Sequence, residues 1–194
     1  MQKRPNFVCA GELRLGGAGA GERNSLSVLN GATIANAQNV FLVYGNDCNV
    51  VVSNGTFVSK QMFFSFTDTA SNACLTVAGE SPLVKSTDWG LRFSRGAKIK
   101  FVVPRNGYAS VPLEGHNYVG IDESCTLEID ATDFLGSDND VVNTPLIYSE
   151  AGLQIDSNVL ANARVTEGCV LRTSADNKTL FLRRKNRGMA FVVR

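Results

Sequence analysis

Asn49-Val50-Val51-Val52-Ser53-Asn54-Gly55 is the stretch that decides the fold, because variants of it recur along the chain. Ser25-Leu26-Ser27-Val28-Leu29-Asn30-Gly31 precedes it, and Cys74-Leu75-Thr76-Val77-Ala78-Gly79 follows it. Lys98-Ile99-Lys100-Phe101 and Cys125-Thr126-Leu127-Glu128-Ile129-Asp130 continue the series more loosely. The leading aliphatic residues, Leu26, Val50, Leu75, Ile99 and Leu127, are 24, 25, 24 and 28 residues apart. A near-constant period of this length, with several short strands in each period, indicates a solenoid.

Two further β-like segments complete each period. The second follows the Asn-Gly pairs, which favour tight corners, and comprises residues 32–34, 56–58, 83–84 and, after Asn106-Gly107, 108–111. The third contains apolar pairs, namely Leu42/Tyr44, Phe64/Phe66, Leu91/Phe93 and Val119/Ile121, with Leu13/Leu15 equivalent in an earlier turn. Because side chains alternate along a strand, stacked turns predict inward columns. One column reads Leu26, Val50, Leu75, Ile99, Leu127, and its neighbour reads Val28, Val52, Val77, Phe101, Ile129.

The pattern predicts an all-β fold, a right-handed single-stranded parallel β-helix of about six rungs with three strands per rung. Residues 1–160 are expected to form the rungs, ending in an irregular rung at 144–148 and 152–155 and a turn or two of helix within 156–163. Residues 161–194 are expected to form a C-terminal antiparallel β cap of the same domain, from strands at 169–174, 179–184 and 189–194. An antiparallel sandwich would also place Asn-Gly between strands, but it does not explain the period.

Composition limits the classes of function. The 194 residues are 44% hydrophobic and 19% charged, with a formal net charge of +1. This balance gives no electrostatic attraction toward nucleic acid, and no apolar window is long enough for a membrane-spanning helix. Met1-Gln2-Lys3-Arg4-Pro5 is not followed by the apolar stretch of a signal peptide. We therefore expect no nucleic-acid partner, no transmembrane segment and no signal peptide in this sequence.

Residues 11–34 contain a recognisable succession of motifs. They read Gly11-Glu12-Leu13-Arg14-Leu15-Gly16-Gly17-Ala18-Gly19-Ala20-Gly21, then Asn24-Ser25-Leu26-Ser27-Val28 and Asn30-Gly31-Ala32-Thr33-Ile34. A strand, a glycine-rich loop, Asn-x-Leu-x-Val and Asn-Gly-Ala-x-Val in this order resemble the repeats of autotransporter-passenger-like parallel β-helix proteins. The resemblance covers residues 11–60 well and the later rungs loosely. It implies a secreted or surface-displayed bacterial protein whose coil is a spacer, adhesin or scaffold, and it brings no catalytic residues with it.

The five cysteines, Cys9, Cys48, Cys74, Cys125 and Cys169, lack the spacing of zinc ligands. In the repeat alignment Cys48 and Cys125 share an inward column, with Ala73 and Ala97 between them. Three rungs at ~4.8 Å would separate these two thiols by roughly 14 Å, too far for a disulfide. Cys74 should point outward. We therefore expect mostly free thiols, and no metal site is predicted.

Outward side chains of the first segment suggest an alternative function. Lys98 and Lys100 project from one rung, and Glu128 and Asp130 from the next, so that a Lys100–Glu128 cross-rung ion pair is the simplest interpretation. The alternative is a carbohydrate-active enzyme of polysaccharide-lyase type, in which a Lys or Arg abstracts the proton α to a uronate carboxylate and Ca²⁺ stabilises the developing charge. Arg92, Arg95 and Arg105 are further candidate bases, and Asp122, Glu123 and Glu128 could supply calcium ligands.

Three other features are explained more simply by a structural role than by a catalytic or binding site. His116, the only histidine, is expected in a surface turn. Asp133, Asp138 and Asp140 lie in a polar loop that lacks the glycine turn and terminal glutamate of an EF-hand, so a solvated loop is favoured over a calcium site. Arg183, Arg184, Lys185 and Arg187 form a basic C-terminal stretch that could bind an anion, although a solvated cap is simpler.

These observations predict a non-enzymatic secreted or surface-displayed β-helix module for adhesion, display or carbohydrate contact. Its partner would be a glycan or another cell-surface component. The lyase is the alternative, and calcium is the cofactor that it would use. The lateral faces discriminate between the two, because a groove lined by charges and aromatic rings favours an enzyme or a glycan binder, and a flat Ser/Thr/Asn face favours a scaffold.

Overall fold

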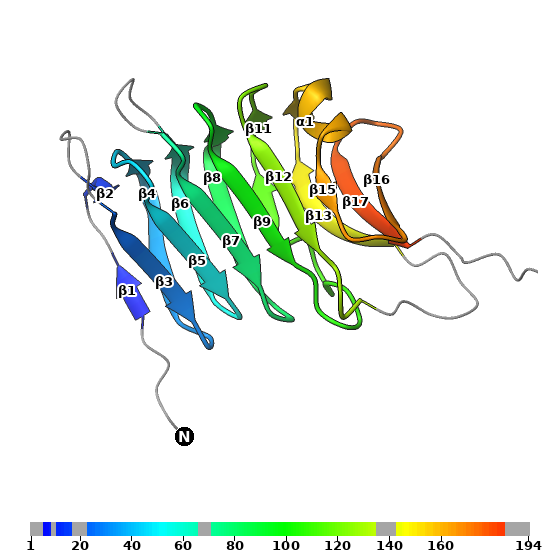
Figure 1. Ribbon diagram of the computed structural model, residues 1–194. Helices are drawn as coiled ribbons and strands as arrows, with labels where there is room; N and C mark the ends of the chain where they lie inside the picture. Colours follow the sequence, from blue (N-terminus) through cyan, green and yellow to red (C-terminus); the bar gives the residue numbers. More distant parts are fainter. Residues whose placement is uncertain (1–5, 9–10, 17–22, 66–70, 135–142, 185–194) are drawn as a thin grey trace, which may run out of the picture.

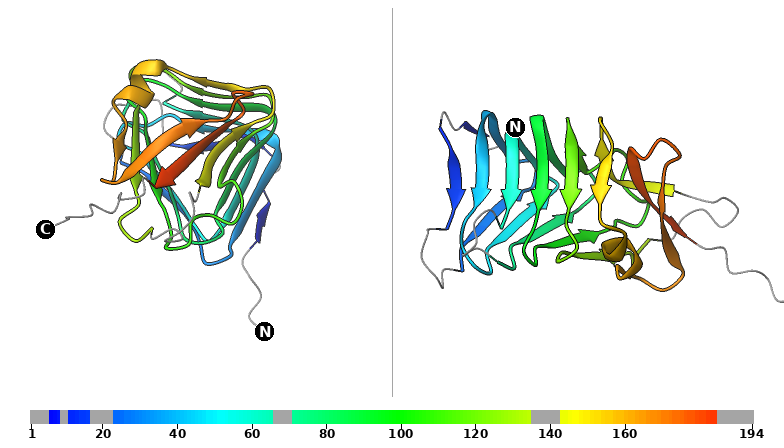
Figure 2. Two further views of the ribbon diagram at one scale, coloured as in Figure 1. Left: turned by 90° about the vertical axis from the view of Figure 1, so that its right-hand side faces the viewer. Right: turned by 90° about the horizontal axis from the view of Figure 1, so that it is seen from above.

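The computed structural model describes residues 6–8, 11–16, 23–65, 71–134 and 143–184 (Figure 1). It is nearly all β, with 58% strand and 3% helix, and is coiled into a β-solenoid of about four turns. Figure 2 shows the strands enclosing a common interior in one view and successive turns lying side by side in the other. Within the described residues, no helix is long and apolar enough to cross a membrane. The predicted all-β solenoid is confirmed, whereas the count of six rungs stays a prediction.

A six-stranded parallel sheet holds the first segment of each turn. Its strands are, in spatial order, β15 (Arg164–Val165), β12 (Thr126–Asp130), β9 (Lys98–Val102), β7 (Cys74–Ala78), β5 (Asn49–Ser53) and β3 (Ser25–Leu29). The register pairs Leu26 with Val50 and continues through Leu75 and Ile99 to Leu127. The column from Val28 to Ile129 pairs in the same way, and all but the partly buried Leu26 are buried. Both predicted inward columns are confirmed.

The second and third segments share one eleven-stranded sheet. Its main path runs through β1 (Asn6–Val8), β4 (Thr33–Val43), β6 (Thr56–Phe64), β8 (Leu83–Phe93), β10 (Leu113–Gly115), β13 (Asn143–Ser149), β17 (Thr179–Arg184) and β16 (Cys169–Thr173). β2 (Leu13–Leu15), β11 (Tyr118–Ile121) and β14 (Leu153–Ile155) pair beside this path. In β4, β6 and β8 the two segments are therefore continuous, whereas β10 and β11 are separate strands.

A buried column of small polar residues marks where the long strands bend. Asn36, Ser59 and Ser86 are in register and fully buried. The Asn36 amide donates to Ser59 Oγ at 3.2 Å, and Ser59 Oγ donates to the Asn39 carbonyl at 2.8 Å. The register shifts at this place in both β4–β6 and β6–β8. The side chains thus provide hydrogen-bond partners where the bend interrupts the regular ladder.

The bend explains an error in the predicted third segment. The pairs Leu91/Phe93 and Val119/Ile121 are confirmed as inward residues. In earlier turns the inward pairs are Phe41/Val43 and Met62/Phe64. The predicted Leu42/Tyr44 is therefore wrong by one residue, whereas Phe64 is inward as predicted but pairs with Met62, and Phe66 lies outside the described residues. Apolar pairs alone do not fix the alternation after a bulge, and Leu42 is buried although it alternates with the inward pair, which makes the wrong pair look inward.

The second segment of the fourth turn also lies elsewhere than predicted. Leu113–Gly115, and not residues 108–111, pairs with Val84–Ser86 of β8. The residues before it form a loop in which the buried Tyr108 hydroxyl donates to the carbonyls of Val102 at 2.9 Å and Val77 at 3.1 Å. Tyr108 therefore fills the corner where the preceding turns have an immediate second strand.

The C-terminal elements were largely predictable. β13 and β14 pair parallel with β10 and β11, as expected for a last irregular turn, and α1 (Ser157–Ala161) follows, with the Asp156 side chain capping it. β15 still pairs parallel with β12, so solenoid pairing continues to Val165, beyond the predicted limit at residue 160. β17 pairs antiparallel with β13 and β16, and the predicted cap stays a prediction. Its third predicted strand, at 189–194, lies outside the described residues.

The cysteine column follows the repeat alignment. Cys48, Ala73, Ala97 and Cys125 are buried, and the carbonyls of Cys48, Ala73 and Ala97 each accept a hydrogen bond from the strand of the next turn. Cys74 and Cys169 are half-buried, and these four described cysteines are free thiols. Cys9 lies outside the described residues. Burial raises the pKa of the Cys125 thiol to about 12, as expected for a small apolar core residue.

Inward and outward residues of one strand should differ sharply in their contribution to stability. Leu75 is fully buried between Val50 and Ile99, so Leu75→Ala is expected to lower the free energy of unfolding by about 2–5 kcal/mol. Thr76→Ala, which changes the adjacent outward position, should cost no more than about 0.5 kcal/mol. Urea denaturation followed by circular dichroism measures both. Equal losses would contradict the assignment of the two faces.

Candidate functional site

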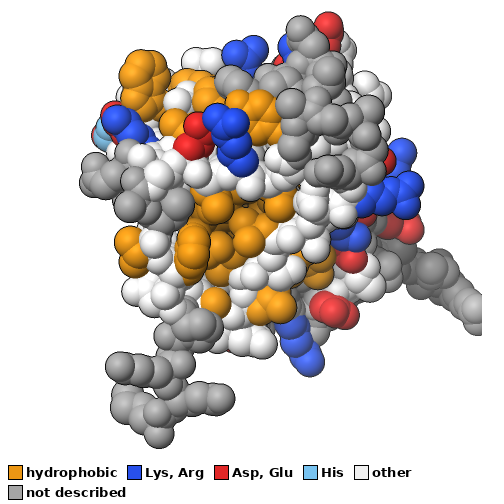
Figure 3. Space-filling model, turned by 90° about the vertical axis from the view of Figure 1, so that its left-hand side faces the viewer, with side chains coloured by type: hydrophobic (Ala, Val, Ile, Leu, Met, Phe, Trp, Pro, Cys, Tyr) orange, Lys and Arg blue, Asp and Glu red, His pale blue; other side chains and the backbone are white. Residues whose placement is uncertain are grey.

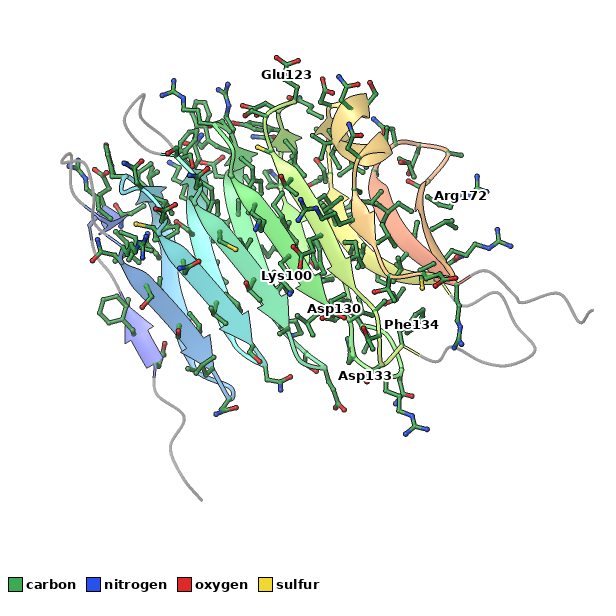
Figure 4. The ribbon with its side chains drawn as sticks, viewed as in Figure 1. Lys100, Glu123, Asp130, Asp133, Phe134 and Arg172 are labelled. Atoms are coloured by element: carbon green, nitrogen blue, oxygen red, sulfur yellow. The ribbon has the colours of Figure 1, made fainter. Side chains whose placement is uncertain are left out.

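The predicted catalytic residues of the first segment lie on the outer face of the six-stranded sheet, where one ion pair joins two of them. Lys98 and Lys100 lie on β9, opposite Thr126 and Glu128 of β12 in register. Lys100 Nζ lies 3.0 Å from Glu128 Oε1, which confirms the cross-rung ion pair. Figure 4 shows Lys100 and Asp130 on this face of the sheet. Lys100 is therefore held by a carboxylate of its own fold.

Electrostatics make Lys100 a poor general base. The hydrogen bond and charge of Glu128 raise the pKa of Lys100, which keeps the amine protonated at neutral pH. Asp130 has its pKa lowered by hydrogen bonds from Thr132, whose hydroxyl donates to Asp130 Oδ1 at 2.8 Å. Both groups are fixed in their charged forms. This arrangement suits a surface ion network better than proton abstraction.

The structure separates the residues of the lyase hypothesis. Arg92 lies on β8 of the eleven-stranded sheet, while Lys98, Lys100, Glu128 and Asp130 lie on the six-stranded sheet. Figure 4 places Glu123 at the upper edge of the coil and Asp133 at the lower edge. The proposed bases and acids are thus not brought together as one set.

Arg92 instead lines two adjoining hollows on the outer face of the third segment. One, of about 310 Å³, is lined by Arg92, Phe93, Tyr118, Gly120, Ile121, Asp122 and Gln154. The other, of about 250 Å³, is lined by Phe63, Arg92, Ser94, Arg95 and Asp122. Arg92 and Asp122 line both hollows, and we call the pair of hollows the Arg92 groove. It combines a cation, a carboxylate, an amide and aromatic rings.

Gly120 forms the floor of the Arg92 groove. In register it lies between Arg92 of β8 and Gln154 of β14, at a position where a side chain would project outward. A Cβ atom at Gly120 would come no closer than 3.5 Å to the Tyr118 ring, which is ordinary van der Waals contact. By contrast, a Cβ atom at Gly90 would lie 2.5 Å from the Tyr118 carbonyl oxygen. The fold therefore requires glycine at position 90 but not at position 120.

Arg92 itself is exposed, and the described residues include no ion-pair partner for it. Asp122 is engaged differently, because its Oδ1 accepts hydrogen bonds from the hydroxyl of Ser124 at 2.6 Å and from the Ser124 amide at 3.2 Å. As far as the described part of the chain goes, the guanidinium is thus open to a ligand while the carboxylate is held in place. Sequence reasoning named Arg92 and Asp122 but missed Tyr118, Gly120 and Gln154, which only the register brings beside them.

His116 lies beside a second group of charged residues at the bend. His116 Nδ1 lies 2.6 Å from Glu150 Oε2, and Lys85 Nζ lies 2.8 Å from Glu114 Oε2. The hollow between them, about 190 Å³, also includes Tyr148. His116 is exposed in the turn between β10 and β11, in agreement with the predicted surface turn. All four side chains already have partners within the cluster, so none of them is left for a ligand.

Another hollow, of about 690 Å³, follows the Asn-Gly corner of the first turns. Asn30 and Asn54 have positive φ values of 53° and 50°, as predicted for this corner. Asn54 Oδ1 accepts hydrogen bonds from the amides of Glu80 at 2.7 Å and Ser81 at 3.2 Å. The amide oxygen therefore stabilises the next corner and is not free for a ligand.

The remaining predicted sites lack a cluster. Within the described parts of the chain, no three His, Cys, Asp or Glu side chains are placed to hold a metal ion; Asp138 and Asp140 lie outside those parts. Arg183 and Arg184 are consecutive on β17 and so point to opposite sides, with Arg184 donating to the Phe134 carbonyl at 3.3 Å. Lys185 and Arg187 lie outside the described residues. The two described residues of the predicted anion patch, Arg183 and Arg184, therefore do not share one face.

Comparisons of the chain with protein-family models, with curated proteins and with solved structures gave no match.

Asp130 should contribute to the pH dependence of stability. Its folded pKa is lowered, so its charged form stabilises the fold above the unfolded value near pH 4, and this contribution is lost as the pH falls through the folded value. Asp130→Asn is expected to reduce the loss of stability on acidification below about pH 4. Urea denaturation at several pH values measures this loss. Asp133→Asn, at an exposed position, is the control, and equal acid sensitivity in the two variants would contradict the assignment.

Proposed function

We propose that this chain is a non-enzymatic, secreted or surface-displayed bacterial β-solenoid module that contacts acidic carbohydrate through the Arg92 groove. The observation that carries the proposal is Gly120, a residue that the backbone does not require and whose missing side chain opens the groove between Arg92 and Gln154. A glycine inside a strand weakens it, and such a position often marks a close approach by a ligand. The groove thus has a shape that packing alone does not explain.

The chemistry of the groove fits a sugar that carries a carboxylate. The Arg92 guanidinium presents a planar fork of donors that matches carboxylate geometry. The Tyr118 ring offers an apolar surface to the C–H face of a pyranose, and the Gln154 amide can both donate to and accept from hydroxyl groups. The two hollows adjoin along the coil, so that consecutive sugar units of an extended chain could occupy them.

The architecture that presents this groove is, in our proposal, a right-handed coil of about six rungs with a C-terminal antiparallel cap. Right-handed connection is the strong preference of parallel strand crossovers in general. The antiparallel pairing of β17 with β13 and β16 supports the cap, because a solenoid end otherwise leaves strand edges unpaired. Such a coil serves as a rigid spacer that holds a lateral groove away from its point of attachment.

A polysaccharide lyase remains the second candidate, and one observation favours it. Arg92 and Asp122 line the same two hollows, where a base and an acidic group would both be needed. Against it, a guanidinium remains charged in proteins, which suits binding of a carboxylate rather than abstraction of a proton. The paired Lys100 lies on the other sheet.

Titration calorimetry with uronate oligosaccharides and with neutral oligosaccharides of equal length tests the proposal. We expect binding of the acidic series, weakened at least about tenfold, or about 1.4 kcal/mol, by Arg92→Ala. Gly120→Leu should weaken binding similarly by filling the groove without lowering the unfolding temperature. Arg105→Ala, which removes an exposed charge outside the groove, should leave binding unchanged.

Ultraviolet absorbance of unsaturated uronate, followed with and without calcium, distinguishes the two functions. The binding module predicts no increase. Product formation that Arg92→Ala abolishes would establish the lyase instead, and absence of binding to any acidic oligosaccharide would contradict both.

A further inference from the structure

The N-terminal end of the described solenoid has an apolar surface and strand edges that pair with no other described strand. β3 ends the six-stranded sheet, and β1 and β2 pair with β4 on one side only. Phe7, Val8 and Leu29 are 52%, 70% and 42% exposed, and Leu13, Leu15 and Leu26 are only partly buried against the core. Figure 3 shows hydrophobic side chains gathered in the middle of this end. We call it the N-terminal end face.

The backbone of β3 has hydrogen-bonding groups that point away from the solenoid. The Asn49 amide donates to the Asn24 carbonyl at 2.8 Å, and the Asn30 amide donates to the Ser53 carbonyl at 3.0 Å. Because these groups alternate along a strand, even-numbered residues of β3 face β5, and Ser25, Ser27 and Leu29 face outward. Among the described strands, β5 is the only partner of β3.

Protein sheets usually protect such an edge with charges, prolines or bulges. β3 reads Ser-Leu-Ser-Val-Leu and has none of these, and its register with β5 is unbroken. A strand of this kind is a template for another strand. Its five residues and the apolar end face beside it therefore suit a partner that continues both the sheet and the core.

We infer that the N-terminal end face is a two-fold interface at which β3 pairs antiparallel with β3 of a second copy of this chain. The opposite end of the molecule is unsuited to this face, because its strands β16 and β17 bear Arg172, Arg183 and Arg184. The β3 edge, by contrast, bears no charged side chain, and the charges of Glu12 and Arg14 beside it are paired with each other. The face is therefore complementary to itself, as a two-fold contact requires.

The register follows from the outward amides. With the two-fold axis at Ser27, the outward amide and carbonyl groups of the two Ser27 residues face each other, and Ser25 pairs with Leu29 of the second copy. On the inward side Leu26 meets Val28 of the second copy, so the two hydrophobic columns join across the interface. The interface thus continues the main-chain ladder and the core at the same time.

Ser27→Pro tests the interface at its centre. It removes an amide that faces outward and leaves the hydrogen bonds between β3 and β5 intact. Sedimentation equilibrium of the 194-residue chain should show a concentration-dependent dimer whose dissociation constant rises at least tenfold in Ser27→Pro. Ser27→Ala, which keeps the amide, should dimerise like the parent.

Ser27→Lys gives a second test that leaves the backbone unchanged. It places two like charges opposite each other across the two-fold axis, so the dimer should weaken and should recover at high salt. A chain that is monomeric at all concentrations, a dimer that neither variant weakens, or open-ended assemblies would overturn the inference. Open-ended assemblies would indicate head-to-tail contact instead.

Discussion

Stacking of like side chains between successive turns is the interaction on which the structure depends. A single turn exposes its own inward row, and only the next turn covers it. Val52, for example, is buried because Val28 and Val77 pair with its strand on either side. The same parallel ladder satisfies the backbone groups of each strand, so burial and hydrogen bonding arise together from one register.

Because the inward side chains and the backbone ladder hold the fold together, the outward positions are open to variation. Lys100 and Glu128 occupy outward positions of the six-stranded sheet, and their pairing raises the pKa of Lys100 without contributing to the core. On the third-segment face, the outward row runs through Phe63, Arg92, Gly120 and Gln154, and the groove exists because one of its members lacks a side chain. A row that holds no part of the core can lose a side chain at little cost in stability.

The period made the first segment predictable from the sequence, because both of its inward columns fall on regular strands without insertions. The third segment was less predictable, since the bend at Asn36 and Ser59 shifts the register between the two halves of β4 and β6. The predicted position of the second strand in the fourth turn was wrong, because the loop that contains Tyr108 interrupts the repeat. Of the site, Arg92 and Asp122 stood out as charged residues. Gly120 and Gln154 did not, because their importance lies in lateral neighbours from other turns.

A disulfide-trapping experiment tests the in-register parallel stacking most directly. The strand register places Asn49 beside the free thiol of Cys74, both pointing outward, and neighbouring strands are spaced at a distance that a disulfide can bridge. Mild oxidation of Asn49→Cys followed by peptide mass mapping should find the introduced thiol bonded to Cys74. In Val51→Cys, which lies beside Thr76 instead, that bond should be absent. Bonding of the introduced thiol at position 49 to a different cysteine, or no bonding while the fold is retained, would contradict the stacking of these turns.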